Sequence, residues 1–359
     1  MSAIPSTHRA VAALSPGKWD VISVPTESPG AGEVLIKVAY TAVIPFDTYQ
    51  TDLGYAVAEW PITLGFSVAG TIAKVGENVP DLKEGDRVTA FTFGNSRTRG
   101  LQEYTVQPYT VVGKVPANVA LPAAATLPDN FVTAFYTLFS EAGLEWPKAS
   151  PASAGKPILV YGAGASSGQY AVQLLHAAGY TNVVATASPR NHAALRALGA
   201  AAVVDYRSAA LAEEIERAAG GKVELAVDCI SNGTTMGAIG KVLAPDGTVA
   251  LLLPMKDGEK VRPEEKDAKF YFEIPDHLQG LIPETAKKLL VRTFLYQRNE
   301  FLKENLMPKI LPELLEKGVI KPNAVRLCED GSLKERAAVA LDLLRNNKIS
   351  GEKVVVKVD

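Results

Sequence analysis

Residues 157–254 constrain the fold most, because they alternate short apolar runs with amphipathic segments. The apolar runs are continuous rather than alternating, which is typical of strands in a parallel sheet that is covered on both faces. The predicted strands are 158–161, 182–187, 202–206, 223–230 and 248–253, and the predicted helices between them are 169–178, 191–198, 209–219 and 234–243. This order predicts a doubly wound α/β sheet.

A glycine-rich turn joins the first predicted strand to the first predicted helix. Gly162, Gly164 and Gly168 would let the chain turn sharply, let a pyrophosphate approach the backbone, and let the helix pack closely on its strand. Gly168 falls one residue later than in the strict dinucleotide fingerprint, so the turn alone would equally suit a tight connection that binds nothing. Inside the βα repeat, however, it predicts a dinucleotide site, where the helix N-terminus favours an anion. The predicted pyrophosphate residues are Gly162, Gly164, Ala165, Ser166, Ser167 and Gly168.

The end of the second predicted strand indicates which dinucleotide binds. NAD sites usually place an acidic residue there to accept hydrogen bonds from the ribose 2′-hydroxyl. Here the segment 185–191 has no acid, and Ser188, Arg190 and Asn191 could donate to a 2′-phosphate. Arg190 could instead only solvate a helix N-terminus. We expect NADPH rather than NADH.

The two ends of the chain predict a second, β-rich domain. Short strands with close spacing and no long helical period dominate the first third of the chain, which favours a small β barrel or sandwich. The last strand, 353–358, could return to this β unit. We therefore predict one domain from residues 1–124 plus 318–359 and a Rossmann domain from 125–317, with the latter including helices at 130–139 and 301–317.

Composition excludes several functional classes. The formal net charge of −2 gives no reason to expect nucleic acid or an anionic membrane surface. No apolar run approaches the roughly 20 residues that span a bilayer, and the N-terminus does not resemble a secretory signal. Cys229 and Cys328 are too few for a disulfide framework and suit a reducing compartment. We expect a cytoplasmic enzyme.

Several ordered motifs extend over essentially the whole chain, at residues 61–76, 85–88, 123–136, the glycine turn, 198–206 and 351–356. In these motifs the chain resembles the medium-chain dehydrogenase/reductase superfamily. The resemblance implies an α/β fold with a GroES-like β domain plus a doubly wound Rossmann domain, and an active site in the cleft between them.

The alcohol dehydrogenase branch of this superfamily holds a catalytic zinc with a Cys, a His-Glu pair and a later Cys or Asp. Here residues 43–47 contain no Cys, and Gly65-Phe66-Ser67 replaces Gly-His-Glu. The four histidines are scattered, and the cysteine-rich structural zinc lobe is absent. Without thiolate or imidazole ligands near this segment we expect no metal site.

Within the superfamily the chain looks most like the zinc-free quinone oxidoreductases and enoyl reductases. Residues 159–167, 188–191 and 205–206 are similar to fungal enoyl reductases that act in trans to polyketide synthases. This resemblance implies that Tyr206 contacts the ribose phosphate and that Thr133 reaches the nicotinamide. Either residue could instead be purely structural.

Chemistry without a metal favours a substrate that needs little polarisation, such as a conjugated C=C–C=O or a quinone. Hydride would add to the β-carbon, and hydrogen-bond donors would stabilise the charge on the oxygen. Tyr49 stands where many relatives carry a lysine, and a phenol with a pKa of about 10 can still donate a proton. Asp47 is interpreted as a residue that stabilises this turn through hydrogen bonds rather than as a catalyst. A hydrophobic substrate pocket could be lined by Phe46, Tyr55, Trp60, Phe66 and Phe93, although such aromatics are more often core.

The leading hypothesis is therefore an NADPH-dependent reductase of an enone or enoyl thioester, with Tyr49 and Thr133 as catalytic residues. A quinone or carbonyl reductase with the same fold is the alternative. A third possibility is an NADPH-binding partner that docks on a synthase and turns over little by itself. We expect a small hydrophobic unsaturated carbonyl or quinone substrate, with a polyketide synthase carrier domain as a candidate partner. The sequence leaves open a monomer or a homodimer, and leaves open whether 248–253 is an edge strand or an internal one.

Overall fold

The computed structural model describes residues 3–146, 151–258 and 269–359, which form two compact units. Unit 1 comprises residues 1–129 and 297–359, and unit 2 comprises 130–296. These boundaries differ from the sequence-based ones, because the helical segment 301–317 belongs to unit 1. Its helix α9 (Leu311–Glu316) packs beside β8 (Val112–Lys114), and its helix α8 (Glu300–Asn305) packs beside Tyr109–Val111. The Tyr109 hydroxyl donates to Glu304 Oε2 at 2.7 Å.

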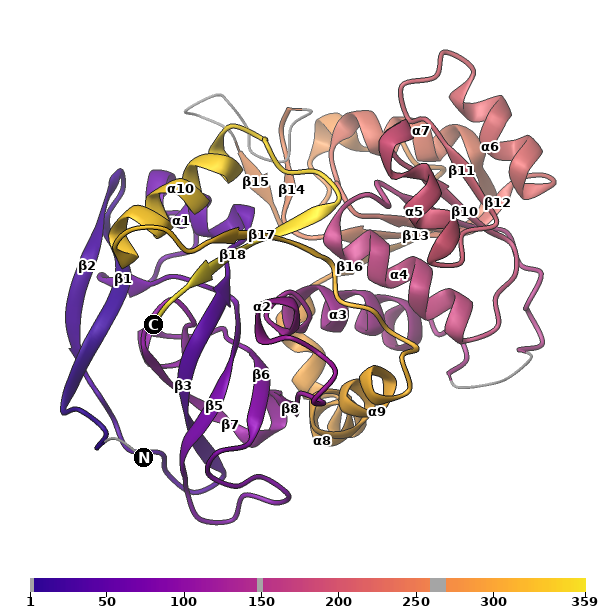
Figure 1. Ribbon diagram of the computed structural model, residues 1–359. Helices are drawn as coiled ribbons and strands as arrows, with labels where there is room; N and C mark the ends of the chain where they lie inside the picture. The colour runs from indigo at the N-terminus through magenta and orange to yellow at the C-terminus, as the bar shows by residue number, and fades with distance from the viewer. Residues whose placement is uncertain (1–2, 147–150, 259–268) are drawn as a thin grey trace. The chain divides into compact units, whose positions relative to one another are not determined.

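Unit 2 is built on a six-stranded, entirely parallel sheet (Figure 1). The strands in spatial order are β11 (Ala202–Val204), β10 (Val183–Thr186), β9 (Ile158–Tyr161), β12 (Val223–Asp228), β13 (Leu243–Leu252) and β16 (Lys287–Val291). In chain order this is 3-2-1-4-5-6, the order of a dinucleotide-binding fold. The predicted doubly wound sheet is confirmed, and the sequence analysis missed only its sixth strand. Because β13 pairs with both β12 and β16, the segment 248–253 is internal.

Helices cover this sheet, as its continuous apolar strands require. They are α3 (Pro128–Phe135), which continues as a π-helix at Tyr136–Glu141, α4 (Ser166–Ala177), α5 (His192–Ala197), α6 (Leu211–Ala219) and α7 (Gly233–Val242). The apolar side chains of α6 and α7 share one core cluster with Leu159 and Tyr161 of β9. Helix α4 packs on β9 and β10. The apolar stripe predicted for this helix is buried there, and includes Ala171, Leu174 and Leu175.

Unit 1 contains the predicted β domain. A three-stranded sheet has the order β2-β1-β4, and a larger sheet has the order β17-β18-β3-β5-β6-β8, with β7 pairing with β3. The bounds are β1 Thr7–Ser15, β2 Lys18–Pro25, β3 Glu33–Ala42, β4 Ile62–Thr63, β5 Ser67–Val75, β6 Arg87–Phe91, β7 Tyr104–Pro108, β17 Ala324–Cys328 and β18 Glu352–Lys357. Strand β18 pairs antiparallel with β3, so the predicted return of the C-terminal strand is confirmed (Figure 1).

The first third of the chain is not all β, contrary to the expectation. Residues Pro45–Leu53 form the helix α1. Pro45 at the first turn already has a helical φ, and Asp47 Oδ2 accepts the Ile44 backbone N–H at 2.8 Å, which caps the helix. Two further helices, α2 (Leu121–Ala124) and α10 (Leu333–Arg345), belong to unit 1. In this way, one short helix places residues 45–53 beside the β core.

A two-stranded sheet follows Pro254 in unit 2. Met255–Lys256 forms β14, which pairs with β15 (Phe270–Tyr271). The segments 145–155 and 256–267 lie partly outside the described residues. Among the described residues, none of the helices has the length and apolar character needed to cross a membrane.

Candidate active site

The glycine turn has the backbone geometry that a close-approach turn requires. Gly162 has a φ of 73°, in the left-handed region that favours glycine, and its N–H donates to Thr186 Oγ1 at 3.0 Å. A Cβ on Gly168 would lie 2.6 Å from Ala163 Cα, so glycine is needed there for the helix to approach its strand. A Cβ on Gly164 would lie 2.8 Å from the Asn191 side-chain nitrogen. The turn is therefore a tight cradle that side chains would fill.

The first turn of α4 offers donors above this cradle. Ala165 is the N-cap and makes no side-chain capping bond, so the amide groups of the first helical turn are not capped by that residue. Ser166 and Ser167 are half-buried and carry hydroxyls at the same place, and Asn130 Nδ2 donates to Ser167 Oγ at 2.9 Å. Backbone amides, hydroxyls and the helix dipole together favour an anion here.

The remaining predicted cofactor residues lie at the carboxyl ends of the neighbouring strands. Ser188, Arg190 and Asn191 follow β10, with Arg190 exposed. Tyr206 follows β11 and is 44% exposed. Because parallel strands end on one edge of the sheet, all of these lie on the same edge as the glycine turn, next to the β9/β12 position where the strand order reverses.

An acidic residue follows the next strand of the sheet, β11. Asp205 follows β11 and accepts from Arg207 Nε and Nη2, each at 3.0 Å. This ion pair holds the pKa of Asp205 below its usual value. The Arg207 guanidinium also lies 5.6 Å from the centre of the Tyr206 ring. A cation therefore offsets the carboxylate close to the predicted ribose-phosphate contact.

Tyr49 lies in α1 and is 5% exposed. Its ring lies 6.0 Å from Phe46 and 6.5 Å from Tyr55, and Phe46 lies 5.3 Å from Phe66 (centroid distances). Burial raises the pKa of Tyr55 to about 12. Three of the five proposed pocket aromatics therefore cluster around Tyr49.

The other two aromatics contribute to the core of unit 1. Trp60 and Phe93 pack against the main apolar core of unit 1, and Phe93 lies 4.8 Å from Phe91. Trp60 and Phe93 are therefore core side chains, as aromatic residues of a β domain more often are.

Asp47 connects the two segments in which a metal-binding relative would carry its ligands. Its Oδ1 accepts the Gly65 N–H at 2.8 Å, and its Oδ2 accepts the Ile44 N–H. Arg99 Nη2 lies 3.5 Å from Asp47 Oδ1 and donates to Gln50 Oε1 at 2.7 Å. Burial raises the pKa of Asp47 and lowers that of Arg99 to about 10, while their mutual attraction opposes both shifts.

Phe66 occupies the position of the missing histidine, and its ring supports the Arg99 guanidinium at 3.7 Å from the centroid. Arg99 is 2% exposed, and its Nε finds no hydrogen-bond partner within the part of the chain that the structure describes. Sequence reasoning missed this cation because Arg99 is separated from Phe66 by more than thirty positions and belongs to no motif.

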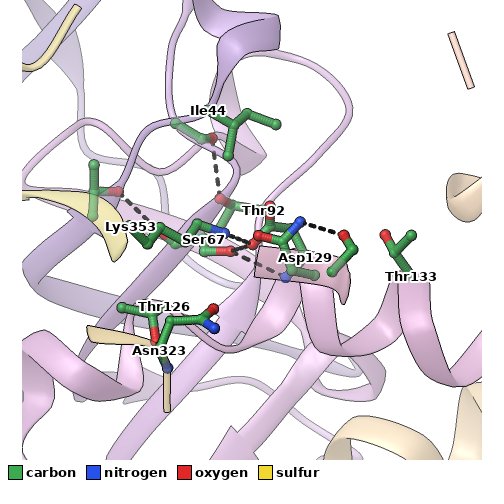
Figure 2. Close-up of polar contacts among 12 residues, drawn as sticks. Ile44, Ser67, Thr92, Thr126, Asp129, Thr133, Asn323 and Lys353 are labelled. Carbon is green, nitrogen blue, oxygen red and sulfur yellow. Dashed lines mark hydrogen bonds and ion pairs between the residues drawn. The ribbon is translucent and has the colours of Figure 1, made fainter. Parts of the chain in front are cut away.

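A second buried ion pair lies beside Ser67 (Figure 2). Ser67 Oγ donates to Asp129 Oδ1 at 2.8 Å and accepts the Asp129 N–H at 3.2 Å. The Lys353 ammonium binds the same Asp129 oxygen. Burial lowers the pKa of Lys353, while Asp129 raises it. Both side chains were missed, because three separate chain segments meet only in the fold.

Thr133 lies four residues after Asp129 in α3, one turn along the same helix (Figure 2). Its hydroxyl lies 3.0 Å from that of Thr293. Its proposed contact with a nicotinamide stays a prediction, as does the proposed role of Tyr49.

The described residues contain no group of three or more His, Cys, Asp or Glu side chains that could hold a metal ion. Relatives in the alcohol dehydrogenase branch carry thiolate and imidazole in the segments that correspond to 43–47 and 65–67. Here these segments carry Asp47, which forms an ion pair with Arg99, and Phe66, whose ring lies under the Arg99 guanidinium. This donor set does not fit a tetrahedral zinc site.

Comparison with known proteins identifies the family. The alcohol dehydrogenase GroES-like domain matches residues 30–129, and the zinc-binding dehydrogenase family matches residues 168–264. A trans-enoyl reductase of Aspergillus japonicus is 31% identical over 332 residues, which cover 91% of this chain and 90% of that protein. The chain belongs to the medium-chain dehydrogenase/reductase superfamily. It falls among the zinc-free, enoyl-reductase-like members.

Other members of the superfamily support the same placement. A trans-enoyl reductase of Gibberella fujikuroi is 29% identical, covering 91% of each chain. The crystal structure of CurK enoyl reductase covers 98% of this chain and 99% of its own, with a TM-score of 0.74 and 24% identity. A quinone oxidoreductase structure from Pseudomonas syringae covers the same shares with a TM-score of 0.76 and 22% identity, so both structures show the fold. The chain is an oxidoreductase of a dinucleotide-binding family.

Proposed function

We propose that the chain is an NADPH-dependent, metal-independent reductase of a conjugated C=C bond in an enone or enoyl thioester. The observation that carries the proposal is the glycine cradle together with the segment 185–191, which has no acid and carries the donors Ser188, Arg190 and Asn191. The relatives named trans-enoyl reductases support the choice of acceptor.

The residues present fit a nicotinamide dinucleotide that carries a 2′-phosphate. Residues 162–168 would hold the pyrophosphate with backbone amides and the two serine hydroxyls. Ser188, Arg190 and Asn191 would donate to the 2′-phosphate, with Tyr206 beside the ribose. When bound, NADPH supplies a hydride and leaves as NADP⁺.

On the substrate, the hydride adds to the β-carbon and the C=C electron pair moves toward the carbonyl, which places negative charge on its oxygen. A donor stabilises that charge, and the α-carbon then takes a proton. Tyr49 is the proposed donor, since it carries a hydroxyl on α1 at the position where many relatives carry a lysine. Thr133 is proposed to orient the nicotinamide. The product is the saturated carbonyl compound.

The cofactor preference is tested by measuring Kd for NADPH and NADH from nicotinamide fluorescence. We expect wild type to bind NADPH at least tenfold more tightly. Arg190→Ala should remove most of this preference by weakening only NADPH, because a charge-assisted bond to phosphate contributes about 1.5–3 kcal/mol. Arg196→Ala, an exposed arginine of α5, is the matched control. Equal affinity of wild type for both dinucleotides would refute the NADPH assignment.

The acceptor is tested with enones, enoyl thioesters, quinones and ketones, monitored by NADPH oxidation. Enones or enoyl thioesters should give the highest kcat/KM. Tyr49→Phe should lower kcat for an enone by 10²-fold or more, while Tyr55→Phe in the same aromatic cluster should not. Unchanged turnover of Tyr49→Phe would remove this residue from the mechanism.

The proposed partner is a polyketide synthase carrier domain that presents the enoyl thioester. A carrier-bound enoyl chain should then be reduced with a lower KM than the same acyl group on a small thiol. Tight NADPH binding without turnover of any acceptor would instead favour a binding partner that acts on a synthase.

A further inference from the structure

Lys256 is a buried lysine that the proposed mechanism does not use. It ends β14 and is 5% exposed. Its Nζ donates to the Ile230 carbonyl oxygen at 2.5 Å, and its backbone N–H donates to the Ser231 carbonyl at 3.2 Å. Two bonds from one residue therefore hold the turn that follows β12.

This turn, Cys229–Asn232, has a conformation that needs such support. Ser231 has a φ of 55°, which is uncommon for a residue with a side chain. Asp228 Oδ1 accepts the N–H groups of Ile230 and Ser231, each at 2.9 Å, and its Oδ2 accepts the Thr235 hydroxyl. Asp228 binds the amides of the turn, while Lys256 binds its carbonyls.

The turn forms one wall of the glycine cradle. A Cβ on Gly162 would lie 2.6 Å from Ile230 Cγ1 and 3.7 Å from Cys229 Cβ. The Cys229 N–H donates to the Tyr161 carbonyl at 3.1 Å, so the turn also continues the pairing of β12 with β9. A shift of the Ile230 side chain would therefore change the space next to Gly162.

Burial lowers the pKa of the Lys256 ammonium to about 8, and the Asp228 carboxylate opposes this shift. Burial raises the pKa of Asp228 and of the Cys229 thiol, and raises that of Tyr161 to about 12. Among the described residues, the neighbouring segments carry the titratable groups Asp257, Tyr271 and His277, and both Tyr271 and His277 contact Asp257. Lys256 is thus the group whose charge changes next to the turn on passing pH 8.

We propose that Lys256 is a positioning residue for the dinucleotide, whose ammonium holds the Cys229–Asn232 turn against the glycine cradle and offsets the Asp228 charge there. With the proton lost, the buried Asp228 carboxylate stands without a compensating cation at the edge where an anionic pyrophosphate would bind. Dinucleotide affinity therefore falls as the pH rises through 8. By linkage, binding the anion takes up a fraction of a proton near this pH. The inference rests on the proposed dinucleotide site.

The test measures Kd for NADPH and NADH on the full chain between pH 7.0 and 9.5 at constant ionic strength. For wild type, Kd for both should rise about tenfold over this range. Lys256→Met should weaken both about tenfold at pH 7 and flatten the profile, whereas Lys256→Arg should bind tightly at pH 7 without the step. Asp228→Asn should move the step to lower pH, because the carboxylate that raises the Lys256 pKa is removed. Lys241→Met, an exposed lysine of α7, should match wild type.

The inference would be overturned if Lys256→Met bound the dinucleotides at pH 7 as tightly as wild type does. It would also be overturned if Kd of this variant still rose with pH as in wild type. Should Lys256→Met not fold, calorimetry of wild type in buffers of different ionisation enthalpy still decides, since no proton uptake at pH 8 contradicts it. A wild type that binds neither dinucleotide refutes the proposed function as well. A wild type that binds, with variants that behave like it, refutes only the role of Lys256.

Discussion

Substitution of Asp47 should reveal how strongly unit 1 depends on its buried ion pair. Asp47 is fully buried and Arg99 is 2% exposed, so neither charge is solvated in the folded state. In Asp47→Asn the guanidinium keeps only the Gln50 bond and its stacking on Phe66. The new amide nitrogen would also face a backbone N–H that the carboxylate accepts from Gly65 or Ile44.

The expected cost follows from these contacts. Removing one partner of a buried ion pair leaves an uncompensated charge, which costs about 3–5 kcal/mol of unfolding free energy. The pKa of Arg99, lowered to about 10, shows that burial already disfavours this cation. Arg99→Met should cost less, about 1–2 kcal/mol, because Asp47 retains both backbone donors while the stacking on Phe66 is lost. The double variant should cost less than the sum of the two, since neither charge is then left alone.

Urea unfolding at pH 7.5, monitored by tryptophan fluorescence and circular dichroism, measures these differences. Because the chain has two units, the fit must allow more than one transition. Glu313→Gln is the control, since it breaks an ion pair with Lys317 in which both side chains are about 60% exposed, and it should cost under about 0.5 kcal/mol. If Asp47→Asn costs no more than this control, or if the two variants add, the ion pair does not stabilise unit 1 as argued.

Three further predictions concern other parts of the molecule. Gly168→Ala forces a Cβ to within 2.6 Å of Ala163 Cα, so it should destabilise unit 2 by about 1–3 kcal/mol in urea unfolding and abolish dinucleotide binding in a fluorescence titration. Gly155→Ala is the control, because a Cβ there meets open space, and it should change neither quantity. Burial lowers the pKa of His8 below 6.5, so the unfolded chain binds a proton more readily and stability falls as the pH drops below 6.5; His8→Gln should show a shallower loss between pH 6.5 and 5 in urea titrations. The folded pKa of Lys256 lies near 8 rather than 10.5, so wild-type stability should rise by roughly 3 kcal/mol from pH 8 to 10.5, and in Lys256→Met this rise should be absent.

The fold of unit 2 was predictable because its information is local. Continuous apolar strands, amphipathic helices and a glycine turn are each properties of neighbouring residues, and five of the six strands were found from them. Strand β16 escaped because Lys287 and Lys288 open it, which resembles a surface segment. Helix α1 was not predicted, because its aromatic residues and threonines are typical of a strand. In the structure Pro45 and the capping bond of Asp47 favour a helix instead.

The placement of the candidate cofactor residues at one edge of the sheet was also predictable, since a strand end is a local feature and parallel strands share one edge. The buried cations were not. Arg99, Lys256 and Lys353 are each ordinary surface residues by composition, and their partners lie far away along the chain. Only the fold brings each of them to a carboxylate or a carbonyl, so no motif could have indicated them.

These cations suggest how the β domain tolerates the loss of a metal. In a zinc-binding relative, the dication would organise the segments around residues 43–47 and 65–67. Here Asp47 joins the two segments through backbone amides, and Arg99 supplies positive charge beside Phe66. Both pairs are buried and internally compensated, which keeps the region rigid while leaving no exposed Lewis acid. The proposed reductase would then depend on hydrogen-bond donors such as Tyr49, and a conjugated acceptor, whose developing charge spreads over several atoms, needs least from such donors.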